Sequence, residues 1–278
     1  MTVIRIKELK ASFAKKKDKS QSFLVKCWVR TNRDSGKIGF IDAFDGSDLE
    51  GIQVVYKKEV TTGFEEAKTV RTGSAIQVEG TINYNDKLNQ TEMVASNFKL
   101  LKQADEDYPL QKKQHSMEFL RSIAHIKPRA KTIQAITFVR NRCAMAIHKF
   151  FQENDFLWIS TPLLTSNDCE GAGESFVIKE DPSNPFFTPA AKLTVSGQLN
   201  VEPYAQAFGR VYTFGPTFRA DRSHTSRHLA EFWMVEPEIA FCELPQMLKI
   251  IEAFIKSVIG DVLKSCKTEI DFFAKEKP

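Results

Sequence analysis

Apolar and polar positions alternate over residues 22–101 with the two-residue period of β-strands. The alternation predicts five short strands, because a strand directs successive side chains to opposite faces of its sheet. A helical spacing interrupts the pattern after the third strand, around residues 64–68. Five strands with a helical crossing after the third are typical of the five-stranded OB barrel. The expected strands cover residues 23–30, 38–44, 52–56, 74–82 and 93–101.

The later part of the chain has longer periods, which predict helices. Apolar residues recur at helical spacing over residues 132–152, and a strand is expected at residues 156–161, where a proline ends it. Residues 244–264 predict another helix, and a charged tail follows it. We expect an α+β chain whose all-β first domain is an OB barrel and whose second domain has an antiparallel sheet. The expected parts are the OB barrel at residues 1–102, a linker or hinge at 103–131, and the second domain at 132–278.

Two β-prone runs, residues 211–218 and 232–241, flank a polar insert and predict a long antiparallel hairpin. The insert is longer and more basic than a turn requires. Arginine binds phosphate through paired hydrogen bonds, and an aromatic ring offers a stacking face to a base. Arg219, the basic loop and Phe232 therefore predict a nucleoside triphosphate site on the hairpin. An ordinary hairpin with a solvated loop is the alternative.

The segments FGPTFRAD and TSRHLAEFWMVEPE of this hairpin resemble motif 2 of the class II aminoacyl-tRNA synthetases. The sequence of these segments is similar to that of the asparaginyl enzymes, which belong to the aspartyl, asparaginyl and lysyl subgroup. The resemblance implies that Arg219 is catalytic and grips the α-phosphate of ATP, while Phe232 stacks on adenine. Where the family usually has Glu two residues after the arginine, this chain has Asp221. Arg227 and His228 complete the ATP-binding set that the resemblance implies.

The segments SNDCEGAGE and TVSGQLNVE resemble the amino-acid-binding elements of the same family. The resemblance implies that Glu170 meets the substrate ammonium group and that Gln198 is a polar anchor. Aspartyl enzymes carry lysine where this chain has Val201, so a substrate carboxylate would be left unpaired. Glu202 can accept an amide N–H, which favours asparagine over aspartate. Glu236 is expected to be a second partner of the ammonium group or of a metal.

The segment WVRTNRDSGKIGFIDAFDGSDLEGIQVV resembles the anticodon-binding domain of the aspartyl and asparaginyl synthetases. The resemblance implies that Phe40 stacks on the central anticodon uridine and that Gln53 forms a hydrogen bond with it. Arg33, just before a turn expected at residues 32–36, is implied to contact the anticodon loop. By pattern alone, Phe40 would be a core residue, because strand phenylalanines are more often buried.

The helix, strand and proline after residue 132 resemble motif 1, a dimer-interface element of the family, which implies a homodimer in the full-length family. A plain core helix is the alternative. The preceding residues, 111–131, are rich in Lys, Arg and His. Such a run is usually a solvated face, but between an anticodon module and a catalytic module it could touch tRNA phosphates.

Composition and charge limit the cellular location and the kinds of site that are expected, but they do not identify a function. The net charge of +4 permits a nucleic-acid partner but does not argue for one. The five cysteines form no CxxC pair, so neither a zinc site nor a disulfide framework is expected. The sequence shows no signal peptide and no run long enough to span a membrane, so we expect a cytoplasmic protein with no membrane partner.

The resemblances together imply an asparagine–tRNA ligase. Such an enzyme uses ATP and Mg²⁺ to activate asparagine as asparaginyl-adenylate and transfers the asparaginyl group to tRNA(Asn). Motif 3 and the acidic Mg²⁺ ligands have no counterpart in the sequence, so we expect an N-terminal portion with no assignable metal ligands and little activity alone. Three alternatives remain: an aspartyl-tRNA synthetase-like enzyme, an amidating asparagine synthetase, which would lack the barrel, and a non-catalytic tRNA-binding fragment.

Overall fold

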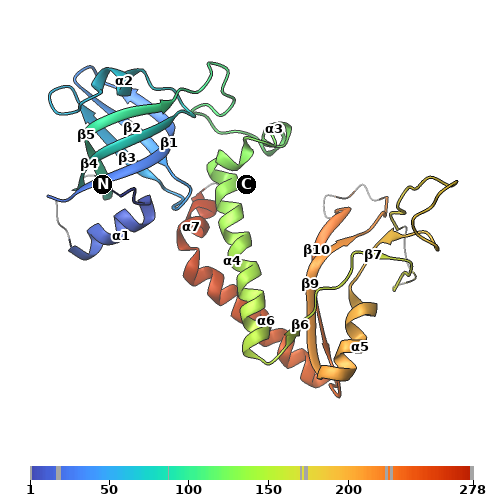
Figure 1. Ribbon diagram of the computed structural model, residues 1–278. Coiled ribbons are helices and arrows are strands. Elements are labelled where there is room, and N and C mark those ends of the chain that lie inside the picture. The colour runs from blue at the N-terminus through green and yellow to red at the C-terminus, as the bar shows by residue number, and fades with distance from the viewer. Residues whose placement is uncertain are drawn as a thin grey trace. The chain divides into compact units, whose positions relative to one another are not determined.

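The computed structural model describes residues 2–16, 20–86, 88–169, 171, 175–222, 225 and 228–275 (Figure 1). The chain forms two compact units, Met1–Arg140 with Cys266–Pro278, and Asn141–Ser265. The division between the units falls within helix α4 (Lys131–Glu153). Packing within a unit does not define a functional domain, so the domain limits expected at residues 102 and 131 stay a prediction.

Five strands of the first unit close into a barrel in the order β1-β2-β3-β5-β4, which confirms the predicted OB barrel. β3 and β5 pair in parallel, and the other neighbours pair antiparallel. Helix α2 (Phe64–Thr69) follows the third strand, where the sequence predicts a helical crossing. The strands are β1 (Ser22–Asp34), β2 (Ile38–Phe44), β3 (Ile52–Lys57), β4 (Ala75–Asn85) and β5 (Gln90–Lys102).

The turn predicted at residues 32–36 is wrong at its start, because β1 continues to Asp34. Tertiary hydrogen bonds hold Asn32 in the strand. Its Nδ2 donates to the Ala67 carbonyl at 2.9 Å, and its Oδ1 accepts from the hydroxyl of buried Tyr56 at 3.0 Å. These partners lie far along the sequence, so local turn propensity could not reveal them.

Helix α1 (Ile6–Lys16) completes the barrel core and is not among the predicted elements. Ile6, Leu9 and Phe13 are buried in the same cluster as the inward residues of the barrel. The helix start is held by Asp45, whose Oδ2 accepts from the Ile6 N–H at 2.8 Å. The many lysines of this segment hid its few apolar positions, so the sequence did not indicate that the helix packs against the barrel.

Three further elements of the first unit lie outside the barrel. They connect or follow the predicted parts, and the last contains Ala274 and Lys275, the first two residues of the charged tail expected at residues 274–278. They are α3 (Met117–Ser122), the 3₁₀ turn η1 (Lys127–Arg129) and α7 (Lys267–Lys275).

The second unit is built on the predicted hairpin of β9 (Arg210–Phe218) and β10 (Glu231–Ile239), which pair antiparallel over their whole length. The strand predicted at residues 156–161 is reduced to β6 (Leu157–Trp158), which pairs in parallel with β9. The remaining elements are β7 (Leu164–Thr165), β8 (Lys192–Leu193), α5 (Gln198–Phe208) and α6 (Leu244–Ser265).

An aromatic cluster forms the core of the second unit. The ring of Phe151 on α4 stacks on Tyr212 of β9, with 4.5 Å between the ring centroids, and Phe254 of α6 packs beside it. Arg142 of α4 pairs with Asp261 of α6 through Nη2 and Oδ1 at 2.6 Å. The two helices are therefore fixed on one side of the hairpin. In the described part of the chain, no helix has the length and apolarity needed to cross a membrane.

Gly39 gives a test of the barrel packing. A Cβ built on Gly39 would overlap the ring of Tyr56, which lies opposite it on β3 and is fully buried. We expect Gly39→Ala to destabilise the first unit by about 1–3 kcal/mol, because an overpacked core must shift. Urea denaturation measures the change. Gly260→Ala is the control, since nothing surrounds that Cβ on α6, and it should be neutral or slightly stabilising. Equal effects of the two changes would contradict this packing.

Candidate functional site

The hairpin of β9 and β10 has two chemically different faces. Residues directly opposite each other in an antiparallel pair lie on the same face, and the register pairs Glu236 with Thr213 and Phe232 with Thr217. The opposite face carries Tyr212, Phe214 and Val235, which pack into the aromatic cluster. We call the first the site face. It consists of Thr213, Gly215 and Thr217 of β9 with Phe232, Met234, Glu236 and Glu238 of β10.

Arg219 extends the site face beyond the end of β9. Its backbone N–H donates to the Ala230 carbonyl at 3.0 Å, so the pairing of the strands continues to this residue. The guanidinium carbon lies 5.6 Å from the centroid of the Phe232 ring, and Nη2 lies 4.0 Å from the sulfur of Met234. The structure thus brings together the arginine and the phenylalanine that the sequence predicts for one nucleotide site.

The loop residues are less closely joined to the hairpin. Asp221 is exposed and makes no hydrogen bond or ion pair with a described residue. His228 is also exposed, and its ring pairs with the Thr225 hydroxyl. Arg227, expected in the ATP-binding set, lies outside the described residues, as does Glu170, expected to meet the amino acid.

Glu236 is held at the other end of the site face by two donors. The Ser196 hydroxyl donates to Oε2, and the Gly197 N–H donates to Oε1 at 3.2 Å. Ser196 is buried, and its place beside a β10 residue depends on packing between segments forty residues apart. Sequence reasoning missed Ser196, although it lies in the segment with Gln198. Gln198 donates from Nε2 to Oε1 of Glu202 at 2.8 Å.

Three carboxylates gather where α5 meets the site face. Burial raises the pKa of Glu238, and the nearby charges of Glu202 and Glu236 raise it further. A cavity of about 230 Å³ adjoins Glu236 and is lined also by Thr161 and Thr213. Such a concentration of carboxylates favours a bound cation, such as an ammonium group, and disfavours a bound anion.

Val201 is a core residue and is not exposed to the cavity beside Glu236. It is fully buried with Ala205 and Val211 in a small core between α5 and β9. It does not line the cavity beside Glu236. The selection of asparagine that the sequence argues from Val201 stays a prediction, and the three carboxylates are the nearer electrostatic reason to disfavour a substrate carboxylate.

The outer face of the barrel carries a second group of predicted residues. β1 and β2 pair Arg33 with Phe40, and β2 and β3 pair Asp42 with Gln53. Because Phe40 and Asp42 are two residues apart, all four share one face. Arg33 lies with Nη2 3.5 Å from Oε1 of Gln53. The structure therefore groups the three residues expected to contact the anticodon loop.

Glu92 belongs with this group and is missing from the sequence prediction. It lies opposite Gln53 through the parallel pairing of β3 and β5, and only 6% of its surface is exposed. Its Oε1 accepts from Nε2 of Gln53 at 2.6 Å, from Nδ2 of Asn85 at 2.8 Å and from Nε2 of Gln90 at 3.4 Å. No signal in the sequence marked Glu92, because it precedes the strand expected at residues 93–101 and its partner Gln53 lies thirty-nine residues away.

The described residues contain no cluster of three or more His, Cys, Asp or Glu side chains arranged to hold a metal ion. Metal ligands therefore remain unassigned among them.

Comparison with known proteins matches both parts of the chain to family models. Residues 116–277 match the model described as tRNA synthetases class II (D, K and N). Residues 23–101 match the model described as OB-fold nucleic acid binding domain.

Two curated relatives are an asparagine–tRNA ligase of Malacoplasma penetrans and another of Mesoplasma florum. The first is 56% identical over 249 residues, covering 89% of this chain and 55% of the relative. The second is 48% identical over 263 residues, covering 93% of this chain and 58% of the relative. The chain thus spans a little over half the length of these relatives.

The structure is similar to that of an asparaginyl-tRNA synthetase from Pyrococcus horikoshii complexed with asparaginyl-adenylate. The TM-score is 0.85 at 26% sequence identity, and the match covers 98% of this chain and 61% of that one. An Entamoeba histolytica asparaginyl-tRNA synthetase has the same fold, with a TM-score of 0.81 at 22% identity, covering 100% of this chain and 62% of that one.

Glu238 provides a test of the carboxylate cluster. An acid whose pKa is raised by folding destabilises the protein as the pH rises above its ordinary value, 4.5 for this side chain. Glu238→Gln removes the ionisation and should raise the thermal midpoint of the second unit at about pH 7 but not at about pH 4. The control is Glu231→Gln, an exposed carboxylate on the same strand. A gain that is equal at both pH values would contradict the clustering.

Proposed function

The chain belongs to the class II tRNA synthetases of the D, K and N group, and from this premise we propose that it forms part of an asparagine–tRNA ligase. Such an enzyme joins asparagine to ATP as asparaginyl-adenylate, releases pyrophosphate and transfers the asparaginyl group to tRNA(Asn). The site face carries the proposal, because it has a cation beside an aromatic ring at one end and gathered carboxylates at the other.

Arg219 and Phe232 are the proposed holders of ATP. They fit a nucleotide because a guanidinium and a ring lie together on the site face. The guanidinium would bind the α-phosphate through paired hydrogen bonds, and the ring would stack on adenine. Asp221, Arg227 and His228 of the loop complete this set by resemblance.

Asparagine would bind at the carboxylate end. Its ammonium group is attracted by Glu236, which Ser196 and Gly197 hold in place, and Glu170 is a further partner by resemblance. Glu202 would accept an N–H of the side-chain amide, next to Gln198. An aspartate side chain would bring another negative charge to the cluster, so the site favours asparagine.

The reaction needs position and charge stabilisation rather than a nucleophilic side chain. The substrate carboxylate attacks the α-phosphorus in line, the new P–O bond forms, and the bond to pyrophosphate breaks. Arg219 would stabilise the charge that builds on the phosphoryl oxygens. Mg²⁺ is typical of this family, but the described residues lack a cluster that fits it, so no step is assigned to the metal.

The barrel is proposed to bind the anticodon of tRNA(Asn), with Phe40 stacked on the central uridine. Gln53 would read the base, and Glu92 would fix the orientation of its amide. A carboxylate only accepts hydrogen bonds, so Nε2 of Gln53 faces Glu92. Oε1, which accepts from Nη2 of Arg33 at 3.5 Å, would use its second lone pair to accept from a base. Uracil offers an N3–H donor, whereas cytosine has an acceptor at N3. A reversed amide would place Oε1 against the carboxylate.

A homodimer through α4 is also part of the proposal. α4 exposes two large apolar side chains, Ile136 at 40% and Met145 at 51%, as an interface helix would. Size measurement with Met145→Glu would test it, since a buried charge at a dimer contact favours the monomer.

The ligase activity can be tested in a chimera, in which this chain replaces the matching part of the Malacoplasma penetrans enzyme. We expect pyrophosphate exchange that depends on asparagine and is not supported by aspartate. Arg219→Ala should lower the exchange rate about 10²–10³-fold, because a preorganised charge-stabilising donor is lost. Arg219→Lys keeps the charge without the fork and should fall between. Near-normal exchange by Arg219→Ala would exclude the proposed role, while tRNA binding should be unchanged in both variants.

The anticodon proposal predicts two different effects on binding of anticodon stem-loops. Phe40→Ala should weaken binding about tenfold, whatever the central base, because base stacking contributes about 1–3 kcal/mol. Glu92→Gln should instead reduce the preference for a central uridine over cytidine, because a glutamine amide allows Gln53 to turn over. Fluorescence anisotropy with the two stem-loops measures both. If Glu92→Gln weakened both stem-loops equally, Glu92 would have only a structural role.

A further inference from the structure

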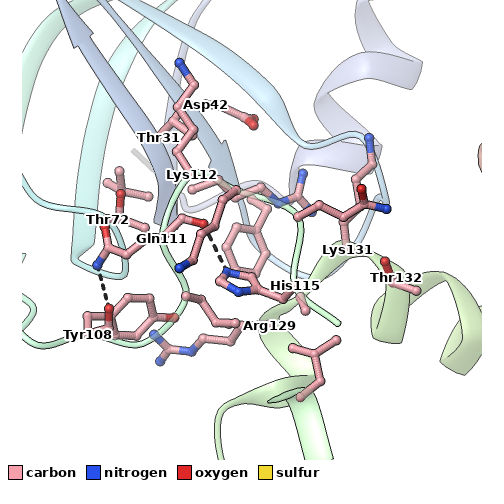
Figure 2. A pocket seen from close by; sticks show the side chains of 18 of the residues that line it. Thr31, Asp42, Thr72, Tyr108, Gln111, Lys112, His115, Arg129, Lys131 and Thr132 are labelled. Carbon is pink, nitrogen blue, oxygen red and sulfur yellow. Dashed lines mark hydrogen bonds between the residues drawn. The ribbon is translucent and has the colours of Figure 1, made fainter. Parts of the chain in front are cut away.

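A cavity of about 440 Å³ lies in the first unit; none of the three predicted anticodon residues lines it, but Asp42 of its lining lies opposite Gln53. Its walls come from β1 and β2 of the barrel, from the segment before α3, from the start of α4 and from α7. Figure 2 shows side chains from the barrel strands and from the following segment around this cavity. Its volume suits a ligand of mononucleotide size.

The described lining is strongly cationic. Five Lys and Arg side chains face one carboxylate, Asp42. Lys131 pairs with Glu50 at 2.8 Å, outside the lining. The lysines of the 108–115 segment, Lys112 and Lys113, are exposed and make no ion pair with a described residue. The five cations are Arg30, Lys112, Lys113, Arg129 and Lys131.

Aromatic rings contact three of these cations, one of which, Lys131, also pairs with Glu50. Arg30 lies over Phe44 at 4.5 Å, Arg129 over Tyr108 at 5.9 Å, and Lys131 over Phe272 at 5.4 Å. A ring orients a cation without neutralising its charge. With five cations and one carboxylate in its described lining, the cavity keeps an excess of positive charge, and the rings orient three of the cations.

Arg30 is the most deeply placed of these groups. It lies at an irregularity of β1 between Val29 and Thr31, where the pairing with β2 shifts and a side chain can be redirected. Its Nη2 donates to the Leu49 carbonyl at 2.9 Å and to Oε1 of Gln134 at 2.8 Å. Its buried Nε has no hydrogen-bond partner among the described residues.

We propose that this cavity is a binding site for one nucleoside phosphate, adjoining the anticodon face at Asp42 and lined by no residue of the site face of the hairpin. The phosphate would be bound by the cations, and the base would lie against the rings and guanidinium planes. The ligand is either a free nucleotide or one nucleotide of a bound RNA strand. The inference needs only the cavity and is independent of the ligase activity.

Calorimetric titration of the whole chain with CMP tests the site, because the two proposed base contacts elsewhere are for adenine and uridine. CMP should bind more tightly than either cytidine or inorganic phosphate. Lys112→Ala with Lys113→Ala should weaken CMP binding about three- to tenfold, through loss of two exposed charge contacts. The matched control is Lys57→Ala with Lys58→Ala, an exposed neighbouring pair on the same barrel outside the cavity.

Asp42→Asn should act in the opposite direction and tighten CMP binding about two- to threefold, because it removes the carboxylate of the lining without changing its size. Opposite effects at Asp42 and at the lysine pair cannot come from a general loss of structure. Absence of CMP binding by the unmodified chain, or an equal loss in both lysine variants, would overturn the proposal.

The salt dependence of tRNA binding separates the two sources of the ligand. If an RNA nucleotide enters the cavity, the lysine pair variant should lower the salt slope by about one for each lost phosphate contact, and the control should not. If CMP binding alone responds, the ligand is a free nucleotide. A changed salt slope without CMP binding would reduce the site to surface contacts with RNA and overturn the cavity as a nucleotide site.

Discussion

The second unit depends on the two-residue alternation of the β9–β10 hairpin, one face of which is closed by aromatic side chains. Tyr212 and Phe214 lie on the closed face, so Thr213 and Glu236 must lie on the other. A slip of the register by one residue would place a glutamate in the core and aromatic rings in water, at a cost of several kcal/mol. Packing of α4 and α6 against one face therefore fixes the chemistry of the other.

The same alternation separates opposite charges along the site face. Phe232, with Arg219 beside it, and Glu238 are six residues apart on β10, which is roughly 20 Å in an extended strand. Glu236 is nearer, at roughly 13 Å by the same geometry. In the proposed function, this spacing would let a cation and a ring bind one substrate while carboxylates bind the other. A triphosphate and an ammonium group would each meet charge of the opposite sign.

The barrel positions polar groups by a different means. Glu92 is buried with no cationic partner among the described residues, and three side-chain amides donate to it. Such a network is stabilising only when every member is satisfied, so the amide of Gln53 has one favourable orientation. In the same unit, Arg30 of β1 and Arg129 of η1 are held by rings and carbonyl groups and keep their charge available. Buried polar groups thus orient the amide of Gln53 on the anticodon face, and cations held by rings make the neighbouring cavity electropositive.

The sequence by itself determined the elements whose pattern is local. Strand alternation located β2 from Ile38 to Phe44, helical spacing located α4 and α6, and the basic insert marked the hairpin loop. The grouping of Arg219 with Phe232 also followed from the sequence. The two strands of a hairpin pair antiparallel, which brings the end of the first strand beside the start of the second.

Tertiary structure decided what depends on segments distant in the chain. Helix α1 forms against the barrel core, Asn32 stays in β1 because α2 and Tyr56 hold its side chain, and β6 pairs over only two residues. Ser196 meets Glu236, and Glu92 meets Gln53, only after folding. The physical reason is the same in each case: hydrogen bonds and apolar contacts between distant segments outweigh local propensity, and their partners cannot be read from spacing along one strand or helix.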